Sequence, residues 1–163
     1  MSDAPRRRYG VAEPKEFSSL NGRQILQAMI EGKLPAPPMA KTLAFELVEV
    51  GEGFAAFEGS PDEAFLNPMG AVHGGWALTL VDSAAGCAAM TLLPVATDYT
   101  TIETKVNFSR PILKDTGKVR AESRIVSQGA RILSAEARVL NAGGRVLAHG
   151  TSTLMVLKER PPE

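Results

Sequence analysis

The sequence is poor in the residues that build disulfides and metal sites, with one cysteine, Cys87, and two histidines, His73 and His149. One cysteine forms no disulfide within a chain, which favours a reducing, cytoplasmic compartment. Met1 to Ser19 contains Arg6-Arg7-Arg8 without a hydrophobic segment after it, so no signal peptide is expected. We expect no metal site, because Cys and His are too few for a ligand cluster. The 18 basic and 18 acidic residues balance, so we expect neither nucleic-acid nor membrane partners.

Two common motifs are also missing. His73-Gly74-Gly75 is similar to the oxyanion-hole loop of lipases, but the chain has no G-x-S-x-G nucleophile elbow. Ser83 lies inside a predicted helix rather than on a strained turn. No G-x-x-x-x-G-K phosphate loop occurs either. These absences argue against a serine hydrolase and a P-loop nucleotide-binding protein.

Charge is nearly absent from the middle of the chain, where Asp82 is the only Asp, Glu, Lys or Arg between Ala64 and Thr97. The run Trp76 to Met90 is helix-like and apolar all round, which predicts a buried helix. A membrane span is disfavoured, since Asp82 falls near the middle of the run. An isolated carboxylate is costly to bury and favours a functional site. The alternative is an Asp that hydrogen-bonds Thr79 or a backbone amide.

The rest of the chain predicts an α+β domain. We expect a flexible segment at 1–19, a short helix and Pro-rich lead-in at 20–40, and the main domain at 41–158. Asn21 and Gln24 form a capping pair for the short helix, and Pro35-Ala36-Pro37-Pro38 predicts an extended connection. Alternation and turn residues predict six antiparallel strands, with the central helix between the second and third: 42–50, 54–58, 100–108, 117–127, 131–141 and 145–157.

A family resemblance sharpens this prediction. The segment Asn67-Pro-Met-Gly-x-x-His-Gly-Gly75, with Asp82 nine residues after the His, resembles the acyl-CoA thioesterases of the phenylacetic-acid-degradation (PaaI-like) type. The strand from Thr101 to Pro111, with its Asn-Phe-x-Arg-Pro end, resembles them too. The resemblance implies the hot-dog fold, in which one six-stranded antiparallel sheet wraps around a long buried helix. The short N-terminal helix would be an appendage to this fold.

The resemblance also implies an activity, the hydrolysis of an acyl-CoA or arylacyl-CoA thioester without a cofactor, since CoA is part of the substrate. Asp82 would act as general base or nucleophile, and the Gly74 N–H would bind the oxyanion. Asn67 would polarise the carbonyl or hold the loop, and His73 would orient it. A hydroxyl on the next strand, Thr101 or else Thr100, would position water. Further expected substrate contacts are Gly75 and, for the nucleotide phosphates, Arg110.

Helix geometry adds a condition on this site. Gly74 and Asp82 are eight residues apart, which is about 12 Å along one helix at about 1.5 Å per residue. One carbonyl cannot contact both, so the pair must come from two chains with antiparallel helices across a two-fold axis. We therefore expect at least a homodimer, and the family resemblance implies that two such dimers can pair into a tetramer. A non-hydrolytic acyl-CoA binder or sensor on the same fold is the alternative function, and it would not need Asp82.

Overall fold

A computed structural model describes residues 8–157 of the chain. Its sheet strands are β1 (Phe45–Gly51), β2 (Phe54–Gly59), β3 (Tyr99–Phe108), β4 (Val119–Gln128), β5 (Ile132–Asn141) and β6 (Val146–Val156). The long helix α4 (Gly74–Met90) joins β2 to β3. Seven predicted elements are therefore present, each within a few residues of its expected bounds.

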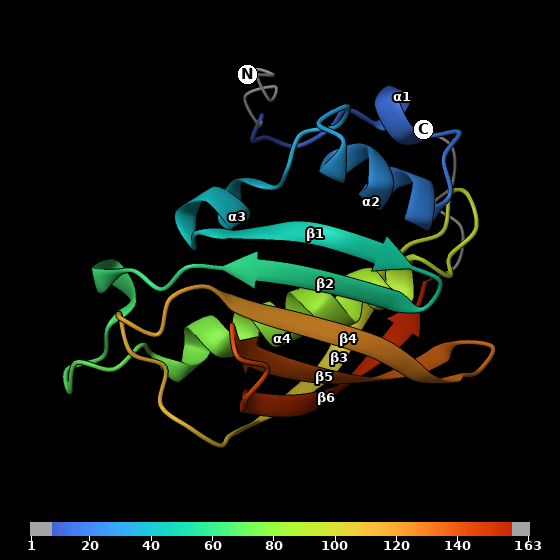
Figure 1. Ribbon diagram of the computed structural model, residues 1–163. Helices are drawn as coiled ribbons and strands as arrows, with labels where there is room; N and C mark the ends of the chain where they lie inside the picture. Colours follow the sequence, from blue (N-terminus) through green and yellow to red (C-terminus); the bar gives the residue numbers. More distant parts are fainter. Residues whose placement is uncertain (1–7, 158–163) are drawn as a thin grey trace.

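The six strands form one antiparallel sheet in the order β1-β2-β4-β5-β6-β3. The sheet curves around α4, which contacts every strand and lies behind β2 and β4 in Figure 1. The last three strands are neighbours, so the predicted meander is confirmed. β3 crosses to the far edge of the sheet and pairs there with β6. This arrangement is the predicted hot-dog fold.

The face of α4 toward the sheet is a close-packed surface of small side chains. Ala77, Leu80, Ala84 and Ala88 are at most 1% exposed. Such small residues allow the curved sheet to approach the helix on several sides. At the first turn, the Trp76 Nε1 donates a hydrogen bond to the Leu43 carbonyl at 2.8 Å, which fixes the start of α4 against the chain before β1.

The N-terminal residues add three short helices, α1 (Pro14–Phe17), α2 (Gly22–Ile30) and α3 (Pro38–Thr42), on the β1 side of the sheet (Figure 1). The predicted Asn21–Gln24 capping box of α2 is confirmed. Gly22 lies against the end of α4, where an added Cβ would be 1.9 Å from the Met90 carbonyl oxygen. A side chain at this position would push α2 off α4.

The chain before β1 differs from the extended connection expected from the sequence. The extended connection expected at Pro35–Pro38 ends early, because Pro38 begins α3, and β1 then begins at Phe45 rather than at residue 42. Proline is well suited to the first helical position, since its missing N–H would have no partner there. Residues 1–7 of the segment expected to be flexible lie outside the described residues, while Tyr9 bridges Ala36.

A β-bulge in β3 decides which side chains reach α4. The pairing with β6 shifts between Thr101 and Glu103, so that Thr101 lies opposite Leu154 and Thr104 opposite Ser152. Leu154 and Ser152 are both buried and two residues apart, hence on one face of β6. Thr101 and Thr104 consequently share the face toward α4, although they are three residues apart.

Candidate active site

Asp82 lies on α4 and is only partly exposed. Its Oδ1 accepts a hydrogen bond from the Thr104 hydroxyl at 2.9 Å. Thr79, the partner expected for a purely structural Asp82, instead donates to the Gly75 carbonyl at 2.9 Å, so that alternative is wrong in this detail. The carboxylate is therefore held by a hydroxyl on the neighbouring strand and is not capped by its own helix.

Sequence reasoning missed Thr104. In a regular strand, alternation would place residues 101 and 103 on one face and residue 104 on the other, so Thr104 would face away from Thr101. The Thr104 hydroxyl also lies 2.9 Å from that of Ser152, which is 2% exposed. One local feature could have indicated these contacts with Asp82. Thr104 and Ser152 are polar residues on strands that are otherwise expected to bury apolar side chains toward the helix.

The start of α4 presents backbone amides. His73 is the N-cap, and its Nδ1 accepts a hydrogen bond from the Gly75 N–H at 2.9 Å. Among the residues that the structure describes, no group accepts a hydrogen bond from the Gly74 N–H. His73 thus caps the first turn, and the Gly74 N–H at the positive end of the helix has no acceptor within the described residues.

Phe108 covers this end of the helix. A Cβ added to Gly74 would meet its ring at 2.9 Å, although the Phe108 side chain is 57% exposed. Glycine at position 74 therefore lets the end of β3 pack over the helix start. The sequence motif contained Phe108 but gave it no role.

Asn67 organises the loop that precedes α4. Its Oδ1 accepts hydrogen bonds from the N–H groups of Met69 at 2.9 Å and Ala71 at 3.2 Å. Its own N–H donates to the Ala71 carbonyl at 2.7 Å. The expected loop-holding role agrees with these contacts, and the Nδ2 amide has no partner within residues 8–157. That amide remains available to polarise a carbonyl.

The other expected contacts lie at different places. Thr100 is exposed and pairs with Met155, on the face of the sheet away from α4. Arg110 follows β3, close to Phe108 in the chain, and donates to the Val146 carbonyl at 2.8 Å. No carboxylate pairs with Arg110 in the described part of the chain, whereas Lys114 pairs with Glu63 at 2.5 Å. Of these two basic side chains, Arg110 is therefore the one without a carboxylate partner among the described residues.

Two further ionisable groups lie close to Asp82. Burial, and next the Asp82 charge, raise the pKa of the Cys87 thiol to about 12. Burial also raises the pKa of Tyr99, with smaller contributions from Cys87 and Asp82. The Tyr99 hydroxyl packs on Gly86, where an added Cβ would be 2.4 Å away. Both groups are neutral at physiological pH, so Cys87 is a poor nucleophile.

Asp82 and Gly74 are not brought together within one chain. Both lie on α4, which is continuous from Gly74 to Met90, so their axial separation is about 12 Å.

The described residues contain no group of three or more His, Cys, Asp or Glu side chains that could hold a metal ion. Of the described helices, none has the length and apolar character needed to cross a membrane.

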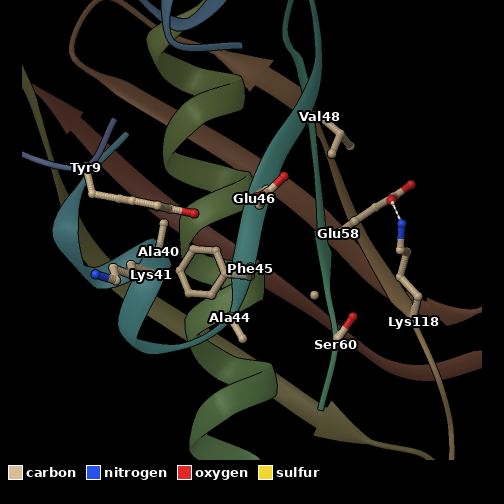
Figure 2. A pocket seen from close by; sticks show the side chains of 11 residues that line it. Tyr9, Ala40, Lys41, Ala44, Phe45, Glu46, Val48, Glu58, Ser60 and Lys118 are labelled. Atoms are coloured by element: carbon tan, nitrogen blue, oxygen red, sulfur yellow. Dashed lines mark ion pairs between the residues drawn. The ribbon is translucent and has the colours of Figure 1, made fainter. Parts of the chain in front are cut away.

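A groove of about 330 Å³ lies elsewhere, beside β1 and α3 (Figure 2). Tyr9, Lys41 and Ser60 contribute to its lining, and Glu58 pairs there with Lys118 at 2.9 Å. None of the expected site residues lines it. This groove is therefore separate from the candidate active site on α4.

The sequence is similar to those of known proteins. The sequence pattern of the Thioesterase superfamily matches residues 69–148, a span that includes both α4 and β3. The chain is therefore similar to this superfamily over about half of its length. The chain is 30% identical over 95 residues to "Putative esterase SSO2140" of Saccharolobus solfataricus. That match covers 58% of the chain and 66% of the relative's length, so the chain spans just under two thirds of that relative.

Solved structures of proteins linked to phenylacetic acid degradation share the fold. A phenylacetic acid degradation-related protein from Ralstonia eutropha superposes with a TM-score of 0.73 at 25% identity, over 80% of this chain and 98% of that one. The PaaI protein of the E. coli phenylacetic acid degradation operon superposes with a TM-score of 0.74 at 21% identity, over 88% and 98%. The predicted resemblance to PaaI-like proteins is confirmed.

Proposed function

We propose that the protein hydrolyses an acyl-CoA or arylacyl-CoA thioester to the free acid and CoA. The observation that carries this proposal is the composition of α4. One helix presents a single carboxylate, Asp82, and one unbonded N-terminal amide, Gly74, which are the two groups that thioester hydrolysis requires. The similarity of residues 69–148 to the Thioesterase superfamily supports the same reaction.

In the proposed reaction Asp82 is the general base. It removes a proton from a water molecule as the water oxygen attacks the thioester carbonyl carbon. The carbonyl oxygen becomes an oxyanion, which accepts a hydrogen bond from the Gly74 N–H at the positive helix end. When the C–S bond breaks, the proton on Asp82 passes to the departing CoA thiolate. The free acid and CoA leave, and Asp82 is again ionised.

We propose that each site is built from two subunits. Because Asp82 and Gly74 are about 12 Å apart on one helix, the amide must come from a partner subunit whose α4 runs antiparallel. Leu78 is midway between them and is 37% exposed, as expected for a residue near a two-fold axis. β3 is a ten-residue edge strand with exposed Ile102, and an unpaired edge of this length favours pairing with a second chain.

The remaining expected residues fit supporting roles in this site. Thr101 shares the α4 face of β3 with Thr104, which suits a hydroxyl that positions the attacking water. Gly75, whose N–H is bonded to His73, would allow close approach of substrate because it has no side chain. Arg110 would meet the CoA phosphates. A reduced Cys87 is compatible with the cytoplasmic compartment in which acyl-CoA substrates occur.

The test is Asp82→Asn, assayed with phenylacetyl-, hydroxybenzoyl- and short- and medium-chain acyl-CoA and a thiol-detecting dye. The rate should fall at least about 100-fold, the usual scale for loss of a general base. Ser83→Ala is the matched control, because Ser83 is the next residue on α4 and has no proposed role. Its rate should equal the wild-type rate.

Two outcomes would reject this proposal. Normal turnover by Asp82→Asn would remove Asp82 from the mechanism. Binding of acyl-CoA by the wild type without release of any thiol would favour the non-hydrolytic binder instead.

A further inference from the structure

Three oxygen atoms form a chain behind the Asp82 carboxylate. The Thr104 Oγ1 lies 2.9 Å from the Asp82 Oδ1 and 2.9 Å from the Ser152 Oγ. The Ser152 Oγ in turn lies 3.0 Å from the carbonyl oxygen of Glu103. All three distances are those of hydrogen bonds, and the chain ends on a backbone group that can only accept.

When Asp82 is ionised, the two hydroxyls have only two protons for these three contacts, so the arrangement must depend on the protonation of Asp82. Each hydroxyl has one proton to donate. When Asp82 is ionised, Thr104 donates to the carboxylate, and the Thr104–Ser152 contact is a hydrogen bond only if Ser152 donates to Thr104. When Asp82 is protonated, the acid donates to Thr104, Thr104 donates to Ser152, and Ser152 turns to the Glu103 carbonyl.

We propose that Thr104 and Ser152 form a reversible hydroxyl relay that supplies a donor to the carboxylate form of Asp82 and an acceptor to its acid form. This inference rests on the proposed function of Asp82 as the general base. Both hydroxyls rotate, and neither arrangement leaves a hydroxyl proton without an acceptor. Thr104 and Ser152 are thus positioning residues, which act on the substrate only through Asp82.

The relay suits a base that must gain and lose a proton in every turnover. A fixed donor, such as a lysine or a backbone amide, would stabilise only the carboxylate and would oppose proton uptake. A hydroxyl can reverse its direction at little cost. Because Ser152 is 2% exposed, water does not readily replace it at the far end of the relay.

The charged groups around Asp82 do not provide an alternative explanation. Cys87 on α4 and Tyr99 on β3 are the neighbours whose pKa values Asp82 raises, and both are neutral. Glu103 and Lys105, which flank Thr104 in β3, are exposed and lie on the other face of the sheet. Within the described residues, the group in direct contact with the Asp82 carboxylate is the Thr104 hydroxyl.

The experiment is a double-mutant cycle with Thr104→Val and Ser152→Ala, which remove one hydroxyl each with little change of shape. Thr104→Val should lower kcat about ten-fold, the scale of one lost hydrogen bond, and leave KM nearly unchanged. Thr104→Ser should restore it. Ser152→Ala should lower kcat a few-fold, but not at all when Thr104 is already Val, because Ser152 acts through Thr104.

Isotope-edited infrared spectroscopy of ¹³C-labelled Asp supplies a readout that needs no turnover. The Asp82 band is identified as the one missing from Asp82→Asn. In the acid form, its C=O stretch should shift in Ser152→Ala although Ser152 does not contact Asp82. The shift should vanish in the Thr104→Val background. If Ser152→Ala does not fold, Ser152→Cys keeps the volume with a weaker donor, and the same outcomes apply.

The relay is refuted if Ser152→Ala leaves both kcat and the Asp82 band at their wild-type values. It is equally refuted if the effects of the two substitutions on kcat simply add, since independent packing defects would do this. A wild-type protein that hydrolyses no thioester would refute the proposed function instead, while the infrared bands would still decide whether the relay exists.

Discussion

Subunit mixing gives the sharpest test of a site shared between two chains. One variant, Asp82→Ala, removes the proposed base. The other, Gly74→Pro, removes the N–H proposed to bind the oxyanion. The backbone at this position suits proline, because position 74 is the first helical residue, where proline is favoured. The preceding His73 already has φ −60° and ψ 134°, the extended region that a residue before proline prefers.

Each variant alone should be nearly inactive. Loss of the base costs about 100-fold or more, and loss of one oxyanion donor costs about 100- to 1,000-fold. After unfolding and random reassembly of equal amounts, about half of the dimers are mixed. In each mixed dimer one of the two sites combines a normal Gly74 with a normal Asp82 from the other chain. About a quarter of the wild-type activity should therefore return on mixing.

Gly74→Ala is the matched control for the proline variant. A Cβ at this position meets the Phe108 ring at 2.9 Å in either case, but alanine keeps the N–H. Activity in Gly74→Ala, together with its loss in Gly74→Pro, would assign the effect to the amide and not to the displaced ring. Gel filtration must show that both inactive variants assemble alike.

The two-subunit site would be refuted by mixed samples that contain exchanged subunits and yet show no activity. A site contained in one chain also predicts this result, since no single chain in the mixture has both groups intact. The assay thus separates the two arrangements without a structure of the complex.

Two further predictions concern residues around Asp82. Thr101→Val should slow turnover about ten-fold if the hydroxyl positions water, whereas Thr100→Val, on the opposite face, should not; equal rates in the two variants would remove Thr101 from the site. Burial raises the pKa of Cys87 to about 12, above the value near 8.5 of an unfolded thiol, so the folded state binds the proton more tightly. Stability should therefore be full below about pH 8.5 and fall as the pH rises toward 12. Chemical denaturation across this range should show a smaller fall in Cys87→Ala, and an identical fall would contradict the assignment.

The fold could be predicted because its signals are local. Alternation and turn residues indicate the strands, and an apolar run too long for a strand indicates α4. The short helix α3 could not be predicted, because its sequence Pro-Met-Ala-Lys-Thr has no period, and its buried Ala40 becomes informative only once β1 lies beneath it. Local patterns therefore predicted the elements that make the core, and tertiary packing decided the connection.

The site was predictable to the extent that it lies on one continuous helix. Asp82, Gly74 and His73 are fixed by helix geometry and motif spacing, which no tertiary detail alters. Thr104 and Ser152 depend on a bulge and on the pairing of strands that are far apart in the sequence. A one-residue bulge reverses which residues face α4. Hydroxyl contacts of this kind become visible only when the register is known.

The scarcity of charged residues near Asp82 in the sequence follows from the packing of α4. α4 is surrounded by the sheet, so its residues must be small and apolar, and the chain from Ala64 to Thr97 contains no Lys or Arg. A nearby Lys or Arg would hold Asp82 ionised and weaken it as a base. In α4 itself Asp82 is the only charged residue, and its carboxylate accepts its hydrogen bond from the neutral hydroxyl of Thr104. The small, apolar residues that let the sheet close around α4 thus leave Asp82 without a basic partner on its own helix.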